Sequence, residues 1–116
     1  MSGVAPPRNR REAVAAALAR LAPRLPGFEA EAVLDRALAS AGLRRAAPET
    51  AARLALVTYA RHVFTDYDAL LADGYDRDSA RHFVLGDLNA ALVAWGATAI
   101  PETEAGEAGV PEDEPR

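Results

Sequence analysis

Residues 61–86 read RHVFTDYDALLADGYDRDSARHFVLG, a stretch that holds both histidines of the chain and five of its aspartates. Thr65 predicts a break in a helix, because its hydroxyl can accept a hydrogen bond from a nearby amide while Asp68 reaches back to the backbone. Gly74 predicts a helix end, since glycine readily adopts the left-handed backbone conformation found there. We therefore expect two helical segments that fold against each other across Gly74.

Three helices are predicted before this break. The first covers about 10–22, where apolar residues recur every three or four positions until prolines follow. The second covers 28–41 and is expected to end at Gly42 in a left-handed cap. The third covers 48–64 and opens with a proline at its first position. Its buried residues are predicted to be Leu56, Val57, Ala60, Val63 and Phe64, with His62 on the opposite side.

Two further helices are predicted after the break. A short one should end at Asp73, and Asp76 is a good N-cap for the last, because its side chain can accept hydrogen bonds from the free amides of the first turn. The last helix is expected to stop at Gly96. Its apolar stripe consists of Ala80, Val84, Leu88, Ala91, Leu92 and Trp95, and Trp95 should be the largest side chain of the core.

The chain of 116 residues has the length of one domain with a single modest core. Residues 1–9 contain two prolines and no periodicity, so they are expected to form a disordered leader. Residues 10–97 should form the helical domain, and 98–116 a disordered acidic tail. The predicted fold class is all-α, a small orthogonal bundle of four or five short helices.

The composition excludes several kinds of site. The chain has no cysteine, which removes disulfides, thiolate metal sites and cysteine nucleophiles. No apolar run approaches the roughly 20 residues that cross a bilayer, and the N-terminal arginines lack the apolar stretch of a secretory signal. A cytoplasmic protein is expected. No glycine-rich phosphate loop and no nucleophile motif occur, so we predict no catalytic residue and no cofactor.

Charge is distributed unevenly along the chain. Residues 1–61 carry ten arginines and five acids, whereas 62–116 carry three arginines and twelve acids. Arginines on helix ends and connections can contact phosphates, but no stacking aromatics or recognition helix accompany them. The candidate nucleic-acid-binding residues are Arg10, Arg11, Arg20, Arg44, Arg45 and Arg53. The acidic residues of 101–116 are expected to compete with phosphate for these arginines.

The histidines and aspartates of 61–86 are the candidates for a metal or acid–base site. His62 and Asp66 are four residues apart, a spacing at which two ligands on one helical face can share an ion. That shared face is lost if the helix breaks at Thr65, and the alternative role of His62 is a hydrogen bond to a carboxylate. The arginines at 61, 77 and 81 are expected to pair with nearby aspartates and clamp the two helical segments together.

A known family shares the order and spacing of a set of residues between 48 and 95, namely Arg61, His62, Thr65, Asp66, Tyr67, Asp68, Leu70, Leu71, Gly74, Asp76, Arg77, Ala80, Arg81 and Trp95. On these residues the segment resembles the bacterial and fungal family known as domain of unknown function 2293. The resemblance implies a small helical domain and assigns no activity.

These observations predict a helical binding module without catalysis. The favoured function is a nucleic-acid-associated accessory protein that binds the phosphate backbone through its arginines. The alternative is a protein-interaction or homo-oligomerisation module, because four or five short helices need not cover all of one another's apolar surface. A metal-dependent hydrolase at His62 and Asp66 is a third and more distant alternative.

Overall fold

The computed structural model describes residues 6–104, which contain no strand, confirming the predicted all-α class. Short 3-10 helices cover Ala41–Leu43 and close the described chain at Glu102–Glu104. No described helix is both long and apolar enough to cross a membrane. The five α-helices are α1 (Arg10–Leu21), α2 (Gly27–Ala39), α3 (Pro48–Phe64), α4 (Tyr67–Ala72) and α5 (Arg77–Ala94).

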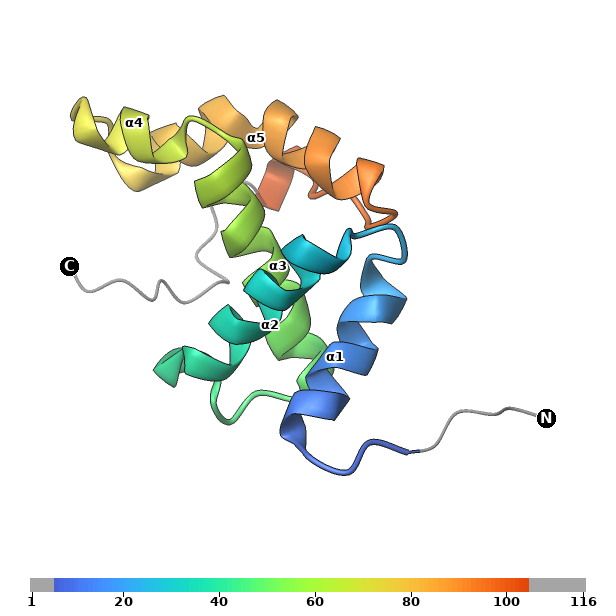
Figure 1. Ribbon diagram of the computed structural model, residues 1–116. Coiled ribbons are helices and arrows are strands. Elements are labelled where there is room, and N and C mark those ends of the chain that lie inside the picture. Colours follow the sequence, from blue (N-terminus) through green and yellow to red (C-terminus); the bar gives the residue numbers. More distant parts are fainter. Residues whose placement is uncertain (1–5, 105–116) are drawn as a thin grey trace.

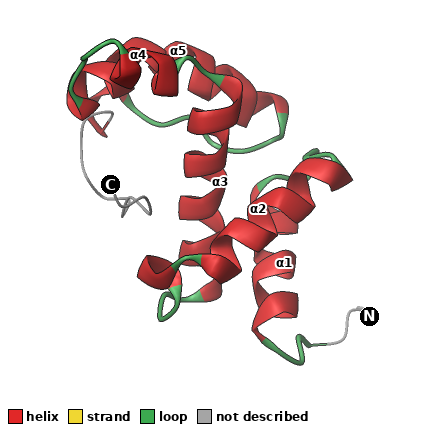
Figure 2. Ribbon diagram, turned by 60° about the vertical axis from the view of Figure 1, so that its left-hand side comes forward, coloured by secondary structure: helices red, strands yellow, loops and turns green. Residues whose placement is uncertain are grey.

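Helix α3 runs through the middle of the protein (Figures 1 and 2), with α1 and α2 against its first half and α5 across its second half. Between residues 51 and 61, every side chain except those of Arg53 and Leu54 is buried. A helix that exposes so little of its circumference belongs to the interior of a bundle. The core is therefore arranged around α3.

Small side chains dominate the contacts between these helices. Alanines can bring two helix backbones close together, and alanine also has the highest helix propensity. Larger side chains fill the remaining space at native packing density. The fully buried alanines of the main core are Ala17, Ala37, Ala51, Ala52, Ala55 and Ala60, and the largest fully buried aliphatic residues are Leu56, Leu88, Leu92, Val14 and Val33.

Helix α4 and the first half of α5 form a helical hairpin, which we call the arm (residues 67–84). It lies at the top left of Figure 1, away from α1 and α2. The arm has a separate small core of Tyr67, Ala80 and Val84. At its tip Gly74 has φ +102°, and the amides of Gly74 and Tyr75 donate to carbonyls of the last turn of α4. The predicted stop at Gly74 is thus confirmed as a left-handed cap.

The predicted break at Thr65 is also confirmed, and of its two expected hydrogen bonds the one to the Thr65 hydroxyl is present while the one from Asp68 is not. The Thr65 hydroxyl accepts from the amide of Tyr67 at 3.1 Å and donates to the carbonyl of Arg61. The N-cap of α4 is Asp66, whose side chain makes no capping bond. Asp68 instead lies 2.6 Å from Nδ1 of His62, so the carboxylate ties the arm to α3.

The C-terminal end of α5 is fixed to the loop between α1 and α2. Trp95 is buried, as predicted, and its carbonyl accepts from the amide of Arg24 at 2.9 Å. The Arg24 guanidinium donates to the carbonyls of Val93 and Ala94, which lie in the last turn of α5. Gly96 then ends the helix with φ +87°. The free carbonyls of this helix end are therefore satisfied by a cap and by an arginine.

Three predictions about side chains and caps are wrong. Val63 and Phe64 are 54% and 42% exposed, because α3 extends beyond the helices that cover its first half. Phe64 still packs against Trp95, with the two rings nearly perpendicular and their centroids 5.2 Å apart. Gly42 lies within a 3-10 helix and has no positive φ, since Ser40 already caps α2.

Ile100, which lies past the boundary predicted at residue 97, contacts helix α5. The Asn89 side chain both accepts from the amide of Ile100 and donates to its carbonyl, at 2.8 and 3.0 Å. Asn9, within the predicted leader, caps α1 by accepting from the amide of Glu12. The remaining parts of the predicted leader and tail, 1–5 and 105–116, lie outside the described residues.

We expect Gly96→Ala to destabilise the protein by at least about 1–2 kcal/mol, the cost of a left-handed backbone for a residue with a Cβ. The added Cβ would also lie 3.0 Å from Cδ of Pro23. Gly86→Ala is the matched control, because Gly86 is helical with nothing within 4 Å of an added Cβ. It should stabilise by about 1 kcal/mol. Urea unfolding of dilute protein measures the stability of both variants. A Gly96→Ala protein as stable as the Gly86→Ala protein would contradict the left-handed cap at Gly96.

Candidate nucleic-acid interface

A group of arginines lies where the start of α1 meets the connection between α2 and α3. The Arg10 guanidinium donates to the carbonyl of Leu43 at 2.8 Å, which fixes Arg10 beside this connection. Arg44 and Arg45 follow directly in the chain, and both are exposed. None of these three arginines forms an ion pair within residues 6–104. We call Arg10, Arg44 and Arg45 the basic end.

The other three predicted nucleic-acid-binding arginines have different surroundings. Arg11 connects α1 to α2 through Glu31 at 3.0 Å and Asp35 at 3.7 Å. Arg20 pairs with Glu49 at 2.8 Å, and Arg53 lines the same shallow hollow of about 320 Å³ between α1 and α3. The structure thus places half of the predicted set together and the other half along the sides of the bundle.

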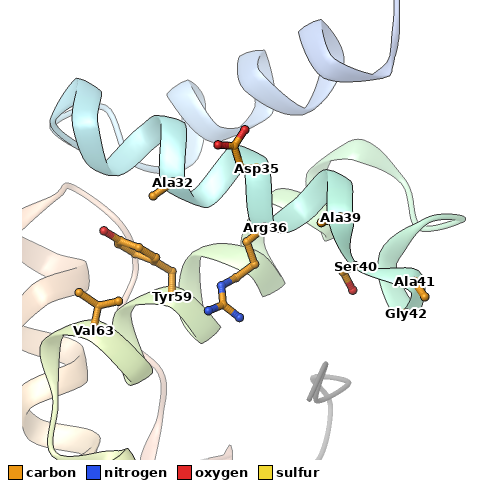
Figure 3. Close-up of a pocket in the computed structure, with 9 residues that line it drawn as sticks. All are labelled: Ala32, Asp35, Arg36, Ala39, Ser40, Ala41, Gly42, Tyr59 and Val63. Carbon is orange, nitrogen blue, oxygen red and sulfur yellow. The ribbon is translucent and has the colours of Figure 1, made fainter. Parts of the chain in front are cut away.

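A groove of about 810 Å³ between α2 and α3 adjoins the basic end. Figure 3 shows the guanidinium of Arg36 extending into it, while Asp35 points away, toward its partner Arg11 on α1. Ser40 and Gly42 line the end of the groove next to the basic end. Arg36 forms no ion pair within the described part of the chain. Sequence patterns did not single out this groove, because it depends on how two helices pack.

The opposite end of the groove contains Tyr59 and Val63. The Tyr59 hydroxyl donates to the carboxylate of Glu29, which joins α3 to the first turn of α2. Burial of the phenol, and secondly the hydrogen bond to Glu29, raise the pKa of Tyr59 to about 12. Tyr59 is therefore a neutral structural residue at ordinary pH, and the cation of Arg36 is the charged group of the groove.

Two of the three family-like arginines, Arg61 at the end of α3 and Arg81 in the arm, have structural contacts. Arg61 is buried with its guanidinium carbon 5.5 Å from the ring centroid of Tyr67, a cation–π arrangement. Arg81 is also buried and lies 3.6 Å from Asp78. That pair lies within α5 and so does not by itself connect the two segments, as a clamp would. Arg77 is exposed near the tip of the arm.

His62 and Asp66 do not share one helical face, because α3 ends at Phe64. His62 contacts Asp68 instead, and its ring edge packs on Tyr67 with the centroids 5.3 Å apart. Within residues 6–104 no three histidine, aspartate or glutamate side chains are grouped as metal ligands. The contacts of His62 are those of a residue that holds the arm against α3.

The fold and its surface define a small α-helical protein with a cluster of arginines at one end and an acidic helical hairpin at the other. The chain belongs to the family described as uncharacterized conserved protein (DUF2293), whose family model matches residues 17–96. This match confirms the resemblance found over 48–95 and extends it to α2 and the end of α1. No curated protein and no solved structure showed a significant match to the chain.

The raised pKa of Tyr59 predicts a loss of stability at high pH. The folded protein disfavours the phenolate relative to the unfolded chain, whose tyrosines ionise near pH 10. The stabilisation is complete below pH 10 and is lost between pH 10 and about 12. Absorbance titration should show an ionisation step near pH 12, and Tyr59→Phe should reduce that step by the absorbance of one tyrosine. Glu29→Gln should lower the pKa of Tyr59 only in part, since burial remains. A step near pH 12 of unchanged size in Tyr59→Phe would contradict the assignment.

Proposed function

We propose that this protein binds the phosphate backbone of nucleic acid through its basic end. The observation that carries the proposal is the grouping of Arg44 and Arg45, both exposed and without an ion-pair partner among residues 6–104, beside Arg10. Guanidinium groups present several donors in one plane and bind phosphate oxygens in pairs. A cytoplasmic location is part of this proposal.

The proposed binding reads the backbone and not the bases. Sequence readout requires side chains that reach base edges in a groove, usually from a recognition helix. Arg44 and Arg45 lie in a connection between helices, where contacts to phosphate position a protein without specifying sequence. Arg36 in the adjoining groove supplies a further cation for the same strand. The expected affinity is therefore moderate and strongly dependent on salt.

The acidic charge of the arm orients the proposed binding toward the basic end. The arm carries four aspartates, at 68, 73, 76 and 78, against two arginines, of which Arg81 is buried and Arg77 exposed. Figures 1 and 2 place the arm and the connection between α2 and α3 at opposite ends of the protein, whose longest dimension is 51 Å. A polyanion is repelled by the arm and attracted by the basic end. The acids of residues 101–116 compete with phosphate for the same arginines.

Binding to labelled DNA and RNA of one sequence, measured at several salt concentrations, tests the proposal. The double variant Arg44→Gln/Arg45→Gln should bind more weakly, and the slope of log affinity against log salt should fall by about 0.9 for each duplex DNA phosphate that the variant leaves unneutralised. Arg45→Gln alone should weaken binding more than the matched control Arg77→Gln. Deleting residues 101–116 should strengthen binding, because six acids are removed.

Two results would refute this function. One is the absence of low-salt binding by the protein that lacks residues 101–116. The other is equal binding by the wild type and the double variant at every salt concentration, since the basic end would then bind no phosphate.

A further inference from the structure

Helix α5 has a second apolar stripe on the side that faces away from the core. Phe83 and Val93 are 67% and 52% exposed there, and the exposed small residues Gly86 and Ala90 lie between them. The solvent side of a helix normally carries polar or charged residues. These four positions carry none, and we call them the outer stripe. The core-facing side of the same helix buries Ala80, Val84, Leu88 and Leu92.

Gly86 has no evident role within one protomer. It lies inside the 18-residue helix α5 without a positive φ, and a Cβ built on it meets nothing within 4 Å. Glycine inside a helix costs about 1 kcal/mol relative to alanine. Such a cost is offset where another backbone must approach closely. The approaching backbone is absent from the described part of this chain.

The outer stripe has the same order of large and small residues whether α5 is followed forward or backward. Its order is large, small, small, large, with spacings of three, four and three residues, so its centre lies at the level of Leu88. A two-fold axis at that level would set α5 of a second copy antiparallel to the first, with Gly86 against Ala90 and Phe83 against Val93. A symmetric dimer requires a self-complementary patch of this kind.

The sizes of these side chains also fit a pair of crossing helices. Two helices that cross at an angle are closest at the crossing point and separate toward their ends. Gly86 and Ala90 lie next to the crossing point and allow a close approach. Phe83 and Val93 lie farther out, where larger side chains fill the widening space.

We propose that a second copy of this chain covers the outer stripe, forming a two-fold dimer with antiparallel α5 helices. The area of the patch indicates the strength of the dimer. The exposed Tyr75 extends the patch, with its ring centroid 5.3 Å from that of Phe83. Since a fully covered aromatic side chain buries about 150–250 Å², the patch supplies on the order of 400 Å² per protomer. A standard stable interface needs about 800 Å² per partner, so this dimer forms only at high protein concentration.

This dimer does not depend on the proposed phosphate binding. The basic end is formed by α1 and the connection between α2 and α3, and the outer stripe belongs to α5. A variant that loses phosphate binding can therefore still be tested for dimerisation, and a variant that loses dimerisation can still be tested for phosphate binding.

Sedimentation of the full chain over a range of concentrations tests the dimer. The apparent mass of the wild type should rise with concentration toward twice the monomer mass. Phe83→Glu and Gly86→Leu should both remain monomeric. Gly86→Leu has room within the protomer and a better helix former than glycine, so loss of folding would not explain its result.

The matched control is Val63→Glu, which places the same charge on an exposed apolar residue of α3. It should associate as the wild type does. The proposal is overturned if the wild type stays monomeric at the highest concentration reached, or if Val63→Glu lowers association as much as Phe83→Glu does.

Cross-linking tests the antiparallel arrangement, because the chain contains no cysteine of its own. Gly86→Cys and Ala90→Cys, mixed under oxidising conditions, should form a mixed disulfide several-fold faster than either variant alone. A mixture of Gly86→Cys with Ala69→Cys, an exposed position on α4, gives the background rate. Faster linkage of Gly86→Cys to itself than to Ala90→Cys would contradict the antiparallel dimer.

Discussion

Close packing of helices around α3 is the constraint on which the rest of this structure depends. Almost the whole of α3 between residues 51 and 61 is buried, and alanine occupies four of these positions. With no large side chain at these positions, α1 and α2 can lie close to the α3 backbone. A core built this way has little spare volume, so its stability depends on small residues remaining small.

The same constraint separates the two ends of the protein. One α3 helix reaches from the connection after α2 to the arm, so groups attached to its two ends cannot meet. Arg44 and Arg45 precede the start of α3, whereas His62 and Asp68 fix the arm at its end. Charges of opposite sign are thereby kept apart on one rigid element. The proposed phosphate contacts and the proposed dimer contacts also use different elements, so both can operate in one molecule.

Local signals in the sequence were sufficient to predict the order of the helices and most of their bounds, the end of α2 excepted. Pro48, Thr65, Gly74 and Asp76 act through the backbone of their own neighbourhood, and each of them marks the boundary that was predicted. The predicted left-handed cap at Gly42 was wrong because a 3-10 turn can end a helix without a left-handed residue. The predicted burial of Val63 and Phe64 was wrong because periodicity identifies the apolar face of a helix. It does not show how far along that face the neighbouring helices extend.

The candidate site was less accessible to prediction. Six arginines were selected from their positions in the chain, but their grouping depends on tertiary contacts such as the bond from Arg10 to Leu43. Arg36 was not selected, since nothing in its neighbourhood in the sequence shows that it lines a groove. The outer stripe of α5 was equally hidden, because its residues stand out only when the opposite face is known to be buried.

The stability of Ala55→Leu tests the packing around α3 most directly. Ala55 is 1% exposed, and leucine is nearly as good a helix former as alanine. Overpacking at this position should cost about 1–3 kcal/mol in urea unfolding, whereas the same change at the exposed Ala19 of α1 should stay within about 0.5 kcal/mol of the wild type. An Ala55→Leu protein as stable as the wild type would contradict close packing of the helices around α3.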